Sequence, residues 1–266
     1  MGDLANSIEG LFESGKYADA TICCEGTIFK VHCSIICSQS KVLARMVDGQ
    51  FKEAALRNIE LPNDELPVVA AMMRYLYTGN YIDEAGRSNG PITGMPESTA
   101  EAISPRADPD AMPTDEDDTG LPLLFNVKVY IMADIYDLPG LKTLAKKKFE
   151  KAATICWNTP LFTAAAKKLW ENTVSSDRML RDVIVNICRN HIQALLDRGE
   201  FRDLLRARGD LCLDVLQLTL ERNTAAMKAD ETVSVDNDFD DWGNFARGKG
   251  SKGKKKDKCF HQSFME

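Results

Sequence analysis

Residues that commonly form catalytic and metal sites are scarce in this 266-residue chain, and each absence excludes or disfavours a class of function. The eight cysteines include no Cys-x-x-Cys pair, so the strongest zinc and redox signatures are missing. Only three histidines are present, so few residues could act as the general base of a Ser/His/Asp site. No glycine-rich phosphate motif or pair of catalytic carboxylates stands between a strand and a helix. We therefore expect that the protein is not an enzyme, that it has no catalytic residue, and that it binds no metal or cofactor.

Long apolar runs are also lacking. No stretch reaches the roughly 18 consecutive apolar residues of a membrane-spanning helix, and the N-terminus has neither the cationic nor the apolar part of a signal peptide. We expect a soluble protein inside the cell, in the nucleus or the cytoplasm, with no membrane partner. In that environment the cysteines are expected to be reduced thiols.

The acidic charge is concentrated in one segment. The net charge is -7, and residues 83–120 hold ten carboxylates against two arginines, so the rest of the chain is nearly neutral. The same region is rich in proline and has no helical or strand period. It predicts a disordered acidic insertion at 85–121. A folded core without excess positive charge is not expected to bind nucleic acid.

The last part of the chain, 223–266, has no amphipathic period either and is predicted to be a disordered tail. It contains a basic run, Lys252 to Lys258. Such a run can act as a nuclear import signal or contact nucleic acid nonspecifically. The simpler interpretation is that it keeps the tail soluble. Cys259 and His261 supply two of the four ligands of a structural zinc site, so an unstructured segment is the simpler interpretation.

Between these segments the apolar spacing predicts an α+β fold with more helix than strand. Two short strands meet at a turn containing Glu25 and Gly26, and a third strand is expected at 56–62. A helix starting after Asn63 or Asp64 is expected to end at Gly79, which suits a left-handed cap. The other predicted helices are 4–12, 33–47, two over 122–153, 160–171, 177–197, 200–207 and 210–222.

Once these elements are placed, the residues resemble a BTB/POZ domain, particularly the variety common in fungal proteins. The resemblance implies a BTB/POZ domain over 1–153, interrupted by the insertion, then an all-α helical extension over 154–222 and the tail. It is carried by an Asp opening the first strand, an aromatic-x-Val-His ending the hairpin, a Leu-Tyr-Thr-Gly helix end and an Ala-Asp-x-Tyr step. The residues expected to support the fold are Asp19, His32, Tyr77, Gly79, Asp134 and Tyr136.

The resemblance also implies two protein interfaces. In relatives that bind a cullin scaffold, an apolar-x-Glu step contributes to the contact, and here it falls on Phe51 and Glu53. The alternative is a loop Phe packed in its own core beside a solvated Glu. Dimers of this family bury an N-terminal helix against the partner. In this chain the apolar stripe of that helix is Leu4, Ile8, Leu11 and Phe12. The alternative is that this short stripe covers its own domain.

One cluster near the hairpin admits a chemical interpretation. His32 stands beside Cys33 and one helical turn from Cys37, which suggests either a thiolate pair with an imidazole or a buried histidine with cysteines packed as small hydrophobes. We favour the second. Cys23 and Cys24 are neighbours on a strand and must point to opposite faces.

The resemblance implies a non-enzymatic protein-protein interaction module, a dimerising adaptor that is expected to join a substrate to a cullin-based ubiquitin ligase. The alternative is a nuclear regulatory or scaffold protein whose lysine-rich tail contacts nucleic acid. The lack of a complete zinc finger or other DNA-reading module disfavours that alternative. An enzyme with an unrecognised thiol site ranks third.

Overall fold

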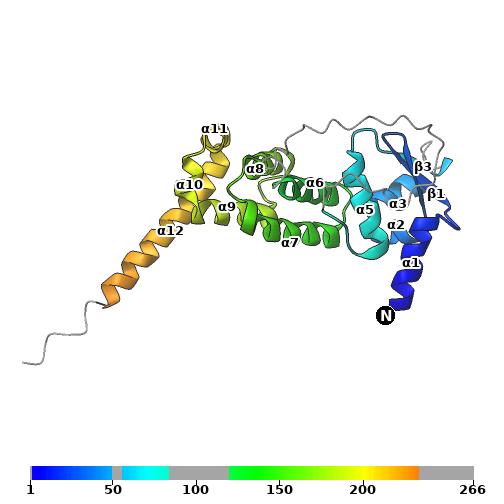
Figure 1. The fold of residues 1–266 in the computed structure, drawn as a ribbon, viewed down its shortest axis with the longest axis horizontal. Coiled ribbons are helices and arrows are strands. Elements are labelled where there is room, and N and C mark those ends of the chain that lie inside the picture. The colour runs from blue at the N-terminus through cyan, green and yellow to red at the C-terminus, as the bar shows by residue number, and fades with distance from the viewer. Residues whose placement is uncertain (1, 50–55, 84–119, 234–266) are drawn as a thin grey trace, which may run out of the picture. The chain divides into compact units, whose positions relative to one another are not determined.

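The computed structural model describes residues 2–49, 56–83 and 120–233, with side chains over 6–49, 56–83 and 120–221 (Figure 1). Contacts group Met1–Leu220 into one compact unit and Glu221–Glu266 into a second. The predicted insertion falls almost wholly within the undescribed 84–119. The predicted α+β class is confirmed: a small sheet is followed by many helices.

The sheet has three strands in the order β2-β1-β3. Strand β1 (Ala20–Cys24) pairs antiparallel with β2 (Thr27–Val31) and parallel with β3 (Asn58–Glu60). The β1–β2 turn has positive φ at both Glu25 (48°) and Gly26 (80°), the backbone of a two-residue type I′ hairpin. The predicted hairpin and third strand are confirmed.

Helices accompany this sheet in the first part of the chain. They are α1 (Gly2–Ser14), α2 (Cys33–Gln39), α3 (Lys41–Asp48) and α5 (Leu66–Thr78). The single helix predicted over 33–47 is wrong, because the chain is extended at Ser40 (φ −124°), whose hydroxyl accepts from the Leu43 N–H and caps α3. Helix α5 begins after Glu65, which makes no side-chain cap, and ends at Gly79 as predicted.

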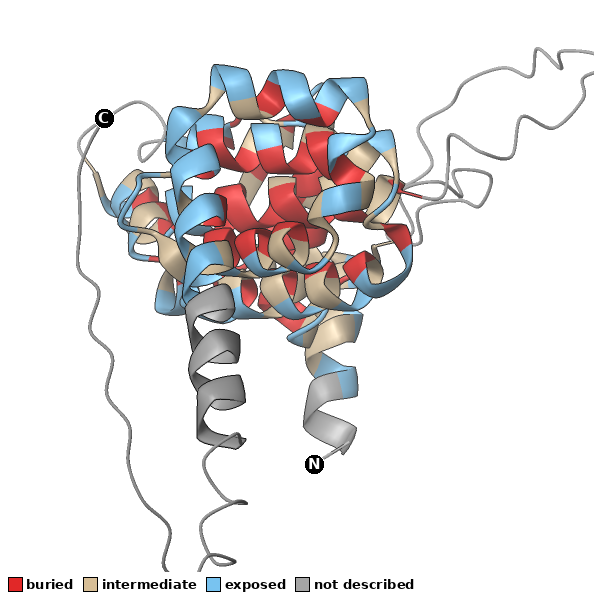
Figure 2. Cartoon of the chain, turned by 90° about the vertical axis from the view of Figure 1, so that its left-hand side faces the viewer, coloured by how far each residue is buried: buried red, intermediate tan, exposed pale blue. Residues whose placement is uncertain are grey.

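Helix α6 (Leu121–Ile135) is the centre of the folded part. It is apolar on nearly all sides and packs against α5, α7 (Pro139–Cys156) and α8 (Pro160–Asn172), which places it inside the unit. Figure 2 shows buried residues on the inner faces of the helices and exposed residues on the outer faces. No helix in the described part of the chain is long and apolar enough to cross a membrane.

The extension continues through α9 (Arg178–Asn190), α10 (Ile192–Leu196), α11 (Gly199–Ala207) and α12 (Gly209–Val233). The single helix predicted over 177–197 is broken at His191 (φ −121°), whose ring stacks on Trp157 with centroids 3.7 Å apart. Helix α12 also runs beyond the predicted limit of 222, into the segment predicted as tail. Residues 225–229 are mostly alanine, methionine and lysine, which favour helix.

Candidate interaction surface

His32 and Tyr77 form a buried polar centre between the hairpin and α5. The Tyr77 hydroxyl accepts from the His32 backbone N–H (2.9 Å) and lies 2.9 Å from Nδ1, while Nε2 lies 2.8 Å from the Lys16 carbonyl oxygen. A carbonyl oxygen only accepts, so Nε2 carries the hydrogen and Tyr77 donates to Nδ1. Burial raises the pKa of Tyr77 to about 12. Both ring nitrogens are therefore used to hold the fold, as the buried-histidine interpretation predicted.

The pKa values of the neighbouring thiols are raised, which disfavours the thiolate form. Burial, together with the hydrogen bond and charge of Asp19, raises the pKa of Cys33 to about 11. Burial also raises the pKa of Cys37. A catalytic or metal-binding thiol needs the opposite shift, toward thiolate at neutral pH. Within the described ranges, no three His, Cys, Asp or Glu side chains are placed to hold a metal ion, and Cys259 and His261 fall outside those ranges.

Asp19 joins three elements of the first part of the chain. Its Oδ1 accepts from the Cys33 N–H at the start of α2 (2.8 Å), and its Oδ2 pairs with Arg57 next to β3 (3.2 Å). The Cys33 N–H bond is the main reason that the pKa of Asp19 is lowered. The carboxylate thus fixes the hairpin against α2 and β3.

The second motif block ties α6 to the first part of the chain across a long sequence separation. The Tyr136 hydroxyl donates to Asp64 (2.8 Å), and buried Ser40 donates to the Tyr136 carbonyl oxygen (2.6 Å). Asp134 pairs with Lys142 on α7. Gly79 has φ 70°, where a side chain would be strained, and it ends α5. These motif residues support the fold.

The residues predicted for the dimer interface on α1 lie in different environments. Phe12 stacks on Tyr77 of its own chain with centroids 4.9 Å apart, and Ile8 packs against the same core. Glu9, between them, pairs with Arg74 on α5 (3.0 Å). Leu11 is half-buried, and the Leu4 side chain lies outside those described. The dimer through α1 stays a prediction.

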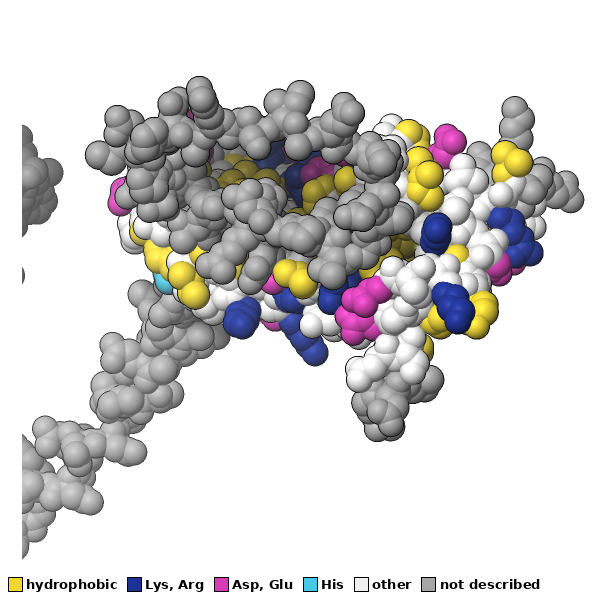
Figure 3. Space-filling view, turned by 45° about the vertical axis from the view of Figure 1, so that its right-hand side comes forward, with side chains coloured by type: hydrophobic (Ala, Val, Ile, Leu, Met, Phe, Trp, Pro, Cys, Tyr) yellow, Lys and Arg dark blue, Asp and Glu magenta, His cyan; other side chains and the backbone are white. Residues whose placement is uncertain are grey.

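Phe51 and Glu53 fall in 50–55, outside the described residues, so their cullin contact also stays a prediction. The same holds for the basic run Lys252 to Lys258. On the face shown in Figure 3, hydrophobic side chains form several small patches separated by charged ones.

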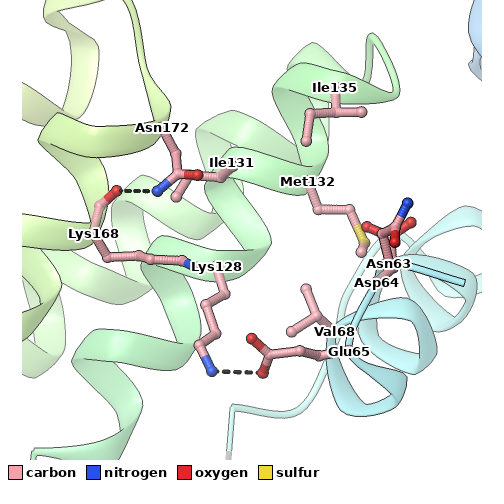
Figure 4. A pocket seen from close by; sticks show the side chains of 10 residues that line it. All are labelled: Asn63, Asp64, Glu65, Val68, Lys128, Ile131, Met132, Ile135, Lys168 and Asn172. Atoms are coloured by element: carbon pink, nitrogen blue, oxygen red, sulfur yellow. Dashed lines mark hydrogen bonds and ion pairs between the residues drawn. The ribbon is translucent and has the colours of Figure 1, made fainter. Parts of the chain in front are cut away.

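A pocket of about 110 Å³ was not predicted from the sequence. Figure 4 shows side chains around it from the segment before α5, from α5 itself, from α6 and from α8. Its apolar part includes Val68, Ile131 and Met132, and Lys128 pairs with Glu65 at its edge (2.5 Å). Pockets for drug-sized ligands usually have about 300–1,000 Å³, so this one is smaller than such a site. The only sequence feature that could have indicated this pocket is Lys128, the one charged residue between 121 and 133.

Comparison with known proteins fits this architecture. Residues 8–90 match the BTB/POZ domain, a range that includes the sheet and α5 but ends before α6. The ARM repeat protein interacting with ABF2 from Arabidopsis thaliana is 36% identical over 72 residues, 27% of this chain and 10% of that protein. The chain therefore spans about a tenth of the length of that relative. Since the match covers the hairpin and the His32–Tyr77 centre, we conclude that the chain contains a BTB/POZ domain, as its sequence motifs indicated.

Proposed function

We propose that this protein is an intracellular adaptor whose BTB/POZ domain pairs with a second copy and connects a bound partner to a cullin-type scaffold. The observation that carries the proposal is the BTB/POZ match over residues 8–90, because domains of this kind are generally interaction modules. The partial relative is itself named for a protein interaction. In the described part, polar motif residues are used to support the fold, which leaves surface complementarity as the mechanism.

The proposed cullin contact is assigned to Phe51 and Glu53. An aromatic side chain that becomes buried supplies most of the energy of such a contact, and a carboxylate beside it selects a basic rim. The test is co-purification of a cullin with the wild-type chain, Phe51→Ala and Glu53→Lys. Binding is expected to fall at least about tenfold in each variant, a loss typical of a contact residue.

Two exposed positions provide matched controls for this experiment. Leu56→Ala removes an apolar side chain that is 74% exposed, and Glu60→Lys reverses a charge on β3. Both controls should retain the cullin. Equal binding by all five proteins, or loss in a control, would contradict the assignment of the contact to Phe51 and Glu53.

The proposed dimer is tested by light scattering. The wild-type chain should show twice the 29.5 kDa mass of one copy, and Leu11→Glu should shift the mass toward one copy because it places a charge on the α1 stripe. Asn6→Glu, an exposed change on the same helix, is the control and should remain a dimer. A single-copy mass for the wild-type chain up to about 100 µM would reject the dimer.

A further inference from the structure

Helix α12 has an apolar stripe that nothing in the described chain covers. Leu213, Leu216 and Leu220 are 54%, 53% and 53% exposed. On the other side of the same helix, Leu211 and Val215 are buried in the core and Leu218 packs against it. One apolar side of α12 is therefore enough to attach the helix to the core of its own chain.

The spacing of the exposed stripe is that of a helix-helix seam. Steps of three and four residues separate the leucines, which gives the repeat of about 3.5 residues by which two helices pack along each other. The sequence continues the same steps to Asn223 and Met227, and α12 extends to Val233.

The charge around the stripe favours a second copy over a different partner. Flanking positions 217 and 219 are Gln and Thr, so two identical stripes meet without repulsion. The nearby carboxylates are already neutralised within the chain: Asp214 pairs with Arg178 (2.7 Å) and Asp210 with Arg181 (3.5 Å). Among the side chains described beside the stripe, a foreign partner chosen by charge would find these two carboxylates already paired.

We propose that two copies of this protein pair through α12, with the Leu213, Leu216 and Leu220 stripe of each copy packed against that of the other. Three half-exposed leucines form a small contact, well below the roughly 1,200 Å² of a stable interface. The pairing is therefore weak, with a dissociation constant on the order of tens of micromolar. It is separate from the proposed α1 dimer.

The test is sedimentation velocity from about 1 to 300 µM on the full chain carrying Leu11→Glu, which removes the α1 contact from the measurement. That protein should associate as its concentration rises. Adding Leu216→Glu and Leu220→Glu should weaken the association at least about tenfold, because each Glu places a charge in the seam. The changed positions are exposed, so an unchanged melting curve is expected and shows that the chain still folds.

The matched control adds Ile155→Glu and Val174→Glu, which change two apolar side chains that are 78% and 66% exposed outside α12. Association should be the same as in the Leu11→Glu protein. The proposal is overturned by a single-copy mass for the Leu11→Glu protein throughout the range, by equal association of the α12 variant, or by loss of association in the control. If Leu11→Glu leaves a tight dimer in place, the α1 assignment fails and larger species report on α12 in the same way.

Discussion

Helices α1 and α12 have similar apolar spacing but use it differently. In α1, Ile8 and Phe12 turn toward α5 of the same chain, and Phe12 stacks on Tyr77. In α12, Leu211 and Val215 face the core, and a second stripe at Leu213, Leu216 and Leu220 faces outward. One apolar stripe is enough to attach a helix to its domain. A second stripe therefore indicates a partner more strongly than a single stripe does.

The largest expected effect separates the two sides of α12. Leu211→Ala should lower the free energy of unfolding by about 2–5 kcal/mol, because Leu211 is fully buried and its loss leaves a cavity. Leu213→Ala, on the outer side, should change it by less than about 0.5 kcal/mol. Urea unfolding of dilute protein measures both. Equal losses would show that the outer stripe is covered within one chain.

A smaller effect is expected for the inner side of α1. Phe12→Ala should cost about 2 kcal/mol, less than the roughly 3–5 kcal/mol of a fully buried Phe, since Phe12 is half-buried against Tyr77. Asn6→Ala on the same helix should cost little. If Phe12→Ala leaves the urea midpoint of dilute protein unchanged, the ring does not cover its own domain and the whole α1 stripe is available to a second copy.

The same comparison shows what the sequence could predict. Apolar spacing located α1, the hairpin and α5, because period and end signals such as Gly79 depend on neighbouring residues. It did not predict the break at Ser40, because apolar residues stand at helical spacing on both sides of it; the local cap from Ser40 to the Leu43 N–H was overlooked, and the bond from Ser40 to the Tyr136 carbonyl oxygen is distant in sequence. The pocket beside Lys128 depends likewise on segments that only the fold brings together. The helix predicted over 210–222 was based on Leu211, Val215 and Leu218, which do lie on the core side, but the spacing gave no sign of the second, exposed stripe.

The hydroxyl of Tyr77 offers a third and smaller test, next to the α1 contact. Tyr77→Phe should lower the free energy of unfolding by about 1–2 kcal/mol, because the buried His32 N–H and Nδ1 lose their partner while the ring still stacks on Phe12. Tyr75→Phe is the matched control on α5. Its hydroxyl shows no hydrogen bond to the described residues, so little change is expected. Equal effects of the two substitutions would contradict the role given to the His32–Tyr77 centre.

The smallest effect concerns pH and the end of the unit that contains α12. Asp177, at the start of α9, accepts from the Tyr130 hydroxyl (2.8 Å) and pairs with Lys142 (2.8 Å), while the next residue, Arg178, pairs with Asp214 on α12. Burial by itself would raise the pKa of Asp177, but the bonds from Lys142 and Tyr130 outweigh it and lower the pKa below the ordinary 3.8. A carboxyl with a lowered folded-state pKa stabilises the fold above its unfolded pKa and loses that contribution as pH falls through the folded value.

Stability should therefore decline as pH drops below about 4, and Asp177→Asn should reduce the slope of that decline in urea midpoints. Asp203→Asn changes a carboxylate that is 73% exposed and should leave the slope nearly intact. Identical slopes for the Asp177→Asn and wild-type proteins would mean that Lys142 and Tyr130 do not favour the charged carboxylate.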